Sequence, residues 1–330
     1  DHVGGAAYFR EKNPGLRVIA SDHNAEHQSY DSRLAAFRGN RSAFAFTEKF
    51  AEAFSYYQAQ GYTEFPAQDS PTADVLVKDK LVFESGGVSF EIIAVPGAET
   101  NDSLIVWLPQ HKICFTGNLF GCPFGHFPNL VTIRGDRYRE ALVVAAAVET
   151  VRALEPEMIC YGHHGPVMGK QIIQDELTAL YNAIHHVHDE TVKGMNAGKD
   201  VHTLMSEITL PTEMEVGQGY GKVSWSVRAI WESYSGWFHH RSTTELYCVP
   251  QSSVASDIVE LAGGAVAILA RAQQKYSAGH NEEAIHLLDI IRDAGADTDQ
   301  SRELGVKVHE SLLEKTDNFW LSAWLKNQVK

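Results

Sequence analysis

Residues 96–108 read PGAETNDSLIVWL, a loop with a carboxylate that leads into a short apolar segment. The proline and glycine at its start predict a turn, and Ser103–Leu108, closed by a further proline, predicts a β-strand. Four more strands are expected on either side of it, namely Leu76–Ser85, Val88–Val95, Ile113–Thr116 and Met158–Tyr161.

Helices are expected between and after these strands. Arg137–Leu154 carries a broad apolar face at helical spacing, and Pro156 ends it. Strands interleaved with a helix indicate α/β layering. After Gly169 strand signals almost disappear, and we expect an α/β domain over residues 1–169 and an all-helical domain over residues 170–330. The helices expected there are Gln171–Ala197, Val201–Glu207, Val223–Tyr234, Val254–Tyr276, Glu282–Ala294 and Ser301–Lys315.

Composition narrows the class of protein. The 330 residues suggest two domains, and 44% hydrophobic with 21% charged residues is ordinary for a globular chain. The net charge of −14 argues against general nucleic-acid binding and against attraction to an anionic membrane surface. No apolar run approaches the roughly 18 residues of a membrane span. The four cysteines are scattered, without a disulfide framework or a zinc-ribbon spacing.

Polar residues follow several of the expected strands. Glu99 lies on the loop before Ser103–Leu108, Asn118 comes after the next strand, and His163 follows Met158–Tyr161. A rigid sheet can direct such loop residues towards a common point. Imidazole and carboxylate groups are ligands that suit zinc, and a zinc-bound water is a nucleophile near neutral pH.

These motifs resemble the metallo-β-lactamase superfamily, whose signature is H-x-H-x-D-H. Asp1 and His2 match its last two residues, so its two histidines are expected just before residue 1, in a chain that looks like the middle of a protein. The stretches 96–108, 129–135 (NLVTIRG) and 163–169 (HHGPVMG) resemble the alkylsulfatase branch. The stretches 220–238 and 259–264 resemble the alkylsulfatase dimerisation domain.

The resemblance implies an αββα metallo-β-lactamase fold followed by an all-α dimerisation domain. It implies that Asp1, His2 and His163 hold one zinc ion, and that Glu99 holds a second with the two upstream histidines. The bridging acid of the family falls at Asn118, whose amide cannot neutralise a pair of cations. We therefore expect one or two zinc ions.

The resemblance also suggests catalytic and substrate-binding residues. The family's histidine before N-L-x-T-x-R-G is replaced by Pro128, so His126 is the candidate for its role, with Asn118 as a second catalytic candidate. Arg134 and Asn129 are candidates for binding substrate, because the planar fork of an arginine suits an anionic ester oxygen.

The function expected is zinc-dependent hydrolysis of a small-molecule sulfuric ester by a metal-activated water. Two alternatives stay open: a hydrolase of the same fold acting on another ester, a thioester or a lactone, and a dimeric non-catalytic module with a degraded metal site. The aromatic-rich stretch 220–238 predicts a homodimer through residues of about 171–300. A chain that begins without Met leaves periplasmic, secreted and cytoplasmic locations all open.

Overall fold

The computed structural model describes residues 3–64, 69–121 and 124–330. The chain forms two compact units, Asp1–Gly236 and Trp237–Lys330. The first unit is α/β and the second is helical. This confirms the predicted fold class of an α/β part followed by a helical part.

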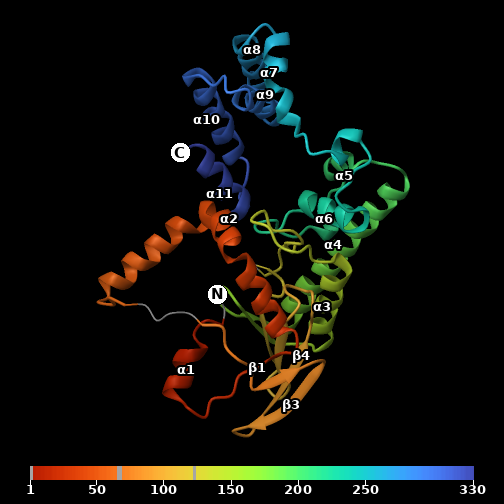
Figure 1. Ribbon diagram of the computed structural model, residues 1–330. Helices are drawn as coiled ribbons and strands as arrows, with labels where there is room; N and C mark the ends of the chain where they lie inside the picture. Colours follow the sequence, from red (N-terminus) through yellow and green to blue (C-terminus); the bar gives the residue numbers. More distant parts are fainter. Residues whose placement is uncertain (1–2, 65–68, 122–123) are drawn as a thin grey trace. The chain divides into compact units, whose positions relative to one another are not determined.

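A six-stranded sheet forms the centre of the first unit (Figure 1). Its strands β3 to β6 form an antiparallel meander, β6 and β7 are parallel, and β7 and β8 are antiparallel. A parallel pair needs a crossover connection, which the helix α3 (Ala141–Ala153) supplies. The strands, in spatial order, are β3 (Lys80–Ser85), β4 (Val88–Ala94), β5 (Leu104–Leu108), β6 (Ile113–Gly117), β7 (Met158–Tyr161) and β8 (Val167–Met168).

The core of this unit lies between one face of the sheet and the helices α3 and α4 (Lys170–Asn196). Alternate strand residues point into it, as expected for a sheet with one covered face. The two helices pack along each other and fill the other side of the core. The most deeply buried members are Ile105, Trp107, Cys114 and Ile159 from the strands and Val148, Val151, Ile173, Leu177 and Ile184 from the helices.

Three further helical segments belong to the sheet unit: α5 (Val201–Glu207), the 3₁₀ helix η1 (Thr212–Met214) and α6 (Val223–Ser235). The helix α5 packs on α6, and α6 packs on α4. By packing, the chain therefore divides after Gly236. The division into domains at residue 169 remains a prediction from the sequence.

The beginning of the chain holds elements that the sequence did not predict. A helix α1 (Ala6–Lys12) precedes a two-stranded parallel sheet of β1 (Ile19–Ser21) and β2 (Val75–Val77). The long helix α2 (Asn24–Ala59) connects these strands and has only Ala45 buried. The single strand predicted over Leu76–Ser85 is wrong, because that stretch contributes to β2 and β3, which lie in different sheets.

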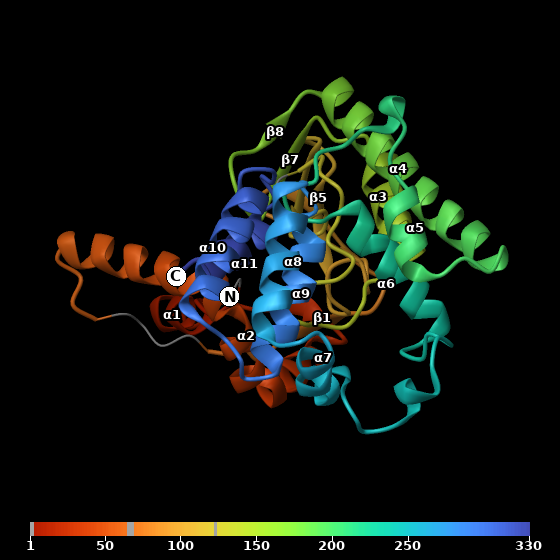
Figure 2. The ribbon, with the colours of Figure 1, turned by 90° about the horizontal axis from the view of Figure 1, so that it is seen from above.

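The second unit consists of helices that pack on their sequence neighbours (Figure 2). Its small core contains Ala272, Ala284, Leu304 and Val308. The single helix predicted over Val254–Tyr276 is wrong: Gly263 and Gly264 have φ values of 83° and 109° and break it in two. The elements are η2 (Thr243–Leu246), η3 (Gln251–Val254), α7 (Ala255–Leu261), α8 (Ala265–Ser277), α9 (Asn281–Asp293), α10 (Asp299–Leu313) and α11 (Phe319–Gln328).

The expectations about disulfides and membrane spans can also be compared with the structure. The cysteines that it describes, Cys114, Cys160 and Cys248, form no disulfide. Within the described ranges no single helix has the length and hydropathy of a membrane span. The segments Gln251–Leu261 and Ala265–Ser277, which meet at 100°, satisfy those criteria only when taken as a pair.

Replacing Leu177 by Ala should destabilise the sheet unit, because this fully buried side chain of α4 belongs to the core beneath the sheet. We expect the free energy of unfolding to fall by about 2–5 kcal/mol. Ile172→Ala, on the same helix but 57% exposed, is the matched control and should stay within about 0.5 kcal/mol of the parent. Urea unfolding followed by circular dichroism measures both, and equal losses would show that α4 is not part of this core.

Candidate active site

Arg139 connects two of the loops in which site residues were predicted. Its Nη2 forms an ion pair with Glu99 Oε1 at 2.9 Å, and its Nε donates to the Glu99 main-chain carbonyl at 2.7 Å. Its Nη1 also donates to the main-chain carbonyl of Asn129. Only 8% of the Arg139 side chain is exposed. The guanidinium therefore fixes the loop before β5 and the loop that begins at residue 129 in one arrangement.

The Glu99 carboxyl lies near groups of both charges, the cationic Arg139 and Arg134 and the acidic Asp136. Burial raises its pKa above the ordinary value, because the charged form loses solvation. The nearby Asp136 adds to the increase, whereas Arg139 and Arg134 lower it. The two arginines thus offset part of the increase in the Glu99 pKa that burial and Asp136 cause.

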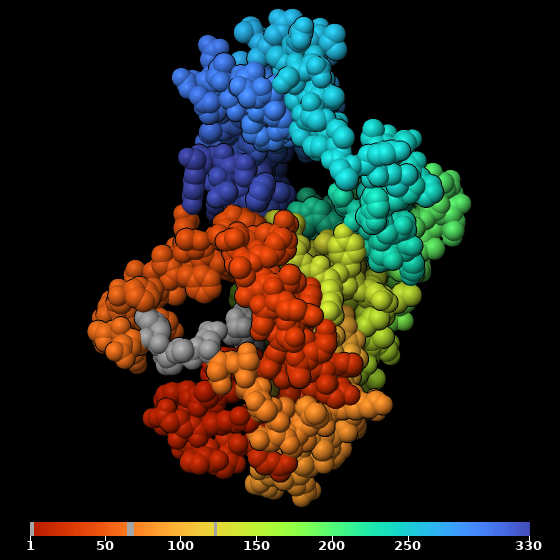
Figure 3. Space-filling view, in the orientation of Figure 1, coloured from red at the N-terminus to blue at the C-terminus, as the bar shows by residue number. Residues whose placement is uncertain are grey.

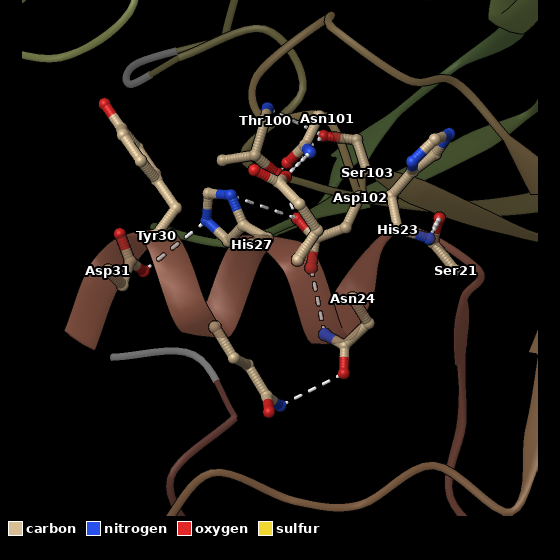
Figure 4. Close-up of polar contacts among 12 residues, drawn as sticks. Ser21, His23, Asn24, His27, Tyr30, Asp31, Thr100, Asn101, Asp102 and Ser103 are labelled. Atoms are coloured by element: carbon tan, nitrogen blue, oxygen red, sulfur yellow. Dashed lines mark hydrogen bonds and ion pairs between the residues drawn. The ribbon is translucent and has the colours of Figure 1, made fainter. Parts of the chain in front are cut away.

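A second polar cluster joins the same loop to α2 (Figure 4). The two carboxylate oxygens of Asp102 accept hydrogen bonds from Asn24 Nδ2 at 2.9 Å and from Thr100 Oγ1 at 2.6 Å. His27 lies between two carboxylates, 4.0 Å from Asp102 and 3.4 Å from Asp31. The sequence did not predict this cluster, although histidine and aspartate four residues apart on one helix face are a recognisable pair.

The structure brings Asn118 close to the segment that carries His163. These residues follow β6 and β7, which are adjacent and parallel, so their carboxyl ends lie at the same edge of the sheet. The amide of Gly162 donates to the Gly117 carbonyl at 2.8 Å. A Cβ on Gly162 would lie 2.2 Å from Asn118 Oδ1, so the Asn118 side chain can keep its present conformation only beside a glycine. His164, which follows His163, has a φ of 66°, an uncommon conformation for a non-glycine residue.

Buried polar groups mark the segment that begins at residue 129. Asn129 and Thr132 are each 4% exposed, and their Nδ2 and Oγ1 atoms have no hydrogen-bond partner among the residues that the structure describes. A buried donor without a partner costs about 1–3 kcal/mol. Nearby, Arg41 holds the main-chain carbonyl of Arg134 at 2.6 Å. This segment therefore combines a fixed backbone with a buried amide that can donate to a ligand.

His126 contacts another part of the chain, the segment at residues 217–219. Its ring packs against Gly217, and its Nδ1 accepts a hydrogen bond from the Gly219 amide at 3.0 Å. A pocket of about 390 Å³ opens beside it, and neither Glu99 nor His163 lines that pocket. Its other lining residues are Phe124, Gly125, Asp175, Glu176, Ala179, Glu215, Val216 and Gly217. Three of these are acidic, so the pocket disfavours an anionic group.

The described residues do not by themselves complete a metal site. Within residues 3–64, 69–121 and 124–330, no three His, Cys, Asp or Glu side chains lie close enough to hold an ion. A zinc site in an enzyme uses three protein ligands. The expected ligands Asp1 and His2 lie outside the described residues, so Glu99 and His163 fit a metal only as members of a larger set.

Comparison with protein families gives a match in each part of the chain. Residues 1–163 match the metallo-beta-lactamase superfamily, and residues 201–327 match the alkyl sulfatase dimerisation family. A linear primary-alkylsulfatase from a Pseudomonas species is 28% identical over 215 residues, which are 64% of this chain and 40% of the relative. The alkyl/aryl-sulfatase BDS1 of Saccharomyces cerevisiae is 25% identical over 247 residues, which are 72% of this chain and 38% of the relative. The chain therefore matches well under half the length of these relatives.

Solved structures agree on the fold. The stereoselective inverting sec-alkylsulfatase Pisa1 from a Pseudomonas species superposes with a TM-score of 0.83 and 21% sequence identity. The match covers 100% of this chain and 54% of that chain. The predicted metallo-beta-lactamase fold with a helical domain after it is thus confirmed. The chain joins a metallo-beta-lactamase domain to an alkyl sulfatase dimerisation domain, and it is a homologue of the alkylsulfatases.

Proposed function

We propose that this protein is a metal-dependent hydrolase of sulfuric esters and that, like the alkylsulfatases, it acts on alkyl sulfates. The observation that carries the proposal is the succession of the two family matches along one chain, the second of which is specific to alkyl sulfatases. The two curated relatives described above are named as sulfatases. Members of the superfamily generally bind metals, usually zinc.

The proposed zinc ligands are those expected from the sequence. Asp1, His2 and His163 would hold one ion, and Glu99 would contribute to a second. A bound zinc would polarise the ester and lower the pKa of a water. The residues of this chain would supply the remaining tasks: Arg139 fixes the Glu99 carboxylate, and Asn118 lies at the strand ends beside the His163 segment.

Two groups are proposed to bind the anionic end of the substrate. The buried Nδ2 of Asn129 is a donor that an ester oxygen could satisfy, and the Arg134 side chain lies close enough to Glu99 to lower its pKa. A charge-assisted hydrogen bond from a guanidinium to an anionic oxygen is about twice as strong as a neutral one. Both groups come from the segment whose backbone Arg139 and Arg41 hold.

His126 remains the proposed proton donor. Because its Nδ1 accepts from the Gly219 amide, a neutral ring carries its proton on Nε2, which can donate. The acidic pocket beside it favours a second candidate function, hydrolysis of an uncharged ester, thioester or lactone. Three carboxylates would repel a sulfate monoester approaching His126 from that side.

Self-association through the helical part is also proposed. The match of residues 201–327 to a dimerisation family supports it. Of the aromatic residues at 220–238, Trp231 packs against the core of the first unit, whereas Tyr234 and Trp237 are 59% and 70% exposed. Tyr234 and Trp237 are therefore each more accessible to a partner subunit than Trp231 is.

His163→Ala should remove most of the hydrolase activity and lower the bound zinc, because a missing ligand weakens the Lewis acid directly. The variant is measured in the protein expressed from its complete gene, by sulfate release from an alkyl sulfate and by metal analysis. His111→Ala, at an exposed turn between β5 and β6, is the control and should behave like the parent. Unchanged zinc and activity in the His163 variant would refute the assignment.

Asn118→Asp should raise the affinity for a second zinc ion, because a carboxylate can bridge two cations where an amide cannot neutralise them. Zinc titration under limiting metal measures the effect, and we expect at least a tenfold tighter second site. Equal binding of two zinc ions by parent and variant would show that Asn118 does not lie at the bridge.

Arg139→Gln should weaken zinc binding by about 10–100-fold, because a partner that orients a metal ligand contributes that much to affinity. Arg137→Gln is a matched control two residues away, since Arg137 also pairs with a glutamate, Glu26, but lies at the surface. Calorimetric zinc titration of both variants distinguishes them. If the two variants bind zinc equally well, Arg139 has no part in positioning Glu99.

A further inference from the structure

The first half of α2 lies against the loop that precedes α3 (Figure 3). Two arginines of this helix, three residues apart and so on one face, make the contact. Arg38 Nη2 pairs with Asp136 Oδ1 at 2.9 Å, and Arg41 Nε donates to the Arg134 carbonyl at 2.6 Å. Arg41 Nη2 also donates to the Ile133 carbonyl at 2.8 Å. One edge of the Arg41 guanidinium therefore binds two consecutive main-chain carbonyls.

The loop makes a tight turn between Thr132 and Gly135. The Gly135 amide donates to the Thr132 carbonyl at 2.9 Å, which closes the turn. The carbonyls of the two central residues, Ile133 and Arg134, take no part in that hydrogen bond. Both accept from Arg41 instead. The helix thus completes the hydrogen bonding of a turn in a distant part of the sequence.

Gly135 allows the turn to approach α2 this closely. Its φ of 94° is a conformation that residues with a side chain rarely adopt. A Cβ at this position would lie 3.3 Å from Arg41 Nε and 3.6 Å from the Phe37 ring. The Arg41 guanidinium also lies over the Phe37 ring, 5.4 Å from its centroid. The conformation of the turn and the placement of the guanidinium therefore fit each other.

The two carbonyls that Arg41 binds belong to the peptide units on either side of the Arg134 Cα atom. Each peptide unit is planar, so the rotations that relate the two units are φ and ψ of Arg134. Holding both units therefore fixes the direction in which the Cα–Cβ bond of Arg134 leaves the main chain. Arg41 thus determines where the Arg134 side chain begins, through contacts with main-chain atoms.

The acidic residue of the same loop is held by α2 as well. Asp136 Oδ1 accepts from Arg38 Nη2, from Tyr30 Oη at 3.2 Å and from the Arg137 amide at 2.8 Å. Only 17% of the Asp136 side chain is exposed. A carboxylate two residues from Arg134 is a potential competitor of an anionic substrate for its guanidinium. The contacts with α2 direct this carboxylate towards the helix.

We propose that Arg41 is a positioning residue, which directs the Arg134 guanidinium towards the anionic group of the substrate by holding the carbonyls of residues 133 and 134. The proposal rests on the proposed function, in which Arg134 binds the sulfate group, and it gives α2 a part in recognising that group. An interaction that is equally strong with substrate and transition state changes KM and leaves kcat unaltered. The loss of Arg41 is therefore expected to appear in KM.

The first test is Arg41→Gln in the complete protein, measured by sulfate release from a linear alkyl sulfate. We expect KM to rise about fivefold or more, with kcat within about twofold of the parent and bound zinc unchanged. Arg33→Gln, at an exposed position of the same helix, is the matched control and should keep the parental KM. An unchanged KM in Arg41→Gln would overturn the proposal, and so would losses of zinc and kcat as large as the change in KM.

The second test asks whether Arg41 acts through Arg134. Arg134→Gln should raise KM, and the double variant with Arg41→Gln should have the same KM as Arg134→Gln alone, because a misplaced side chain has no effect once its guanidinium is removed. Increases that multiply in the double variant would show that Arg41 acts elsewhere and would overturn the proposal.

The third test does not depend on activity. Hydrogen–deuterium exchange in the peptide of residues 130–139 reports on the turn that Gly135 closes. We expect exchange about tenfold faster in Arg41→Gln and parental exchange in Arg33→Gln. Equal exchange in Arg41→Gln and the parent would overturn the positioning role while the proposed hydrolase function stands. A parent that releases no sulfate from alkyl sulfates would instead refute the proposed function, and with it the role of Arg41 towards a substrate.

Discussion

The parallel pairing of β6 with β7 is the constraint on which the candidate site depends. Antiparallel neighbours would place the ends of these strands at opposite edges of the sheet, whereas a parallel pair brings both carboxyl ends to one edge. Asn118 and the His163 segment meet for this reason. The crossover that makes the pair parallel is α3, and α3 is held in place by the core it shares with α4. The packing of two helices thus determines where the polar residues of the site lie.

The second requirement is that the loops at this edge keep a fixed shape. Loops carry few backbone partners of their own, and an unheld loop would lower the effective concentration of any group that it presents. Here a single buried guanidinium, that of Arg139, holds the main chain at two points and one carboxylate. Asp102 of the same loop also accepts a hydrogen bond from Asn24 of α2. The polar contacts therefore fix the positions of the loops, as the apolar core fixes the position of the sheet.

Much of the sheet and its site could be predicted from the sequence, because each strand is a short apolar run bounded by turn residues. Glu99 was expected on the loop before a strand and Asn118 and His163 just after strands, and their positions relative to β5, β6 and β7 agree with this. Contacts between distant positions could not be predicted, and Arg139 with Glu99 is the clearest example, since no local pattern relates residues 40 positions apart. The helix α2 was missed for another reason: only Ala45 of its 36 residues is buried, so its sequence lacks the broad apolar face that makes helical periodicity informative.

The close fit of Gly162 against Asn118 has a consequence for how related sequences can vary. A side chain at position 162 would overlap the Asn118 amide as it lies here, so a change at 162 requires residue 118 to change or its side chain to move. A lineage that acquires alanine at 162 must also shorten or turn away residue 118, whereas one that restores a carboxylate at 118 must retain glycine at 162. Covariation between these two positions would therefore record the geometry of the strand ends.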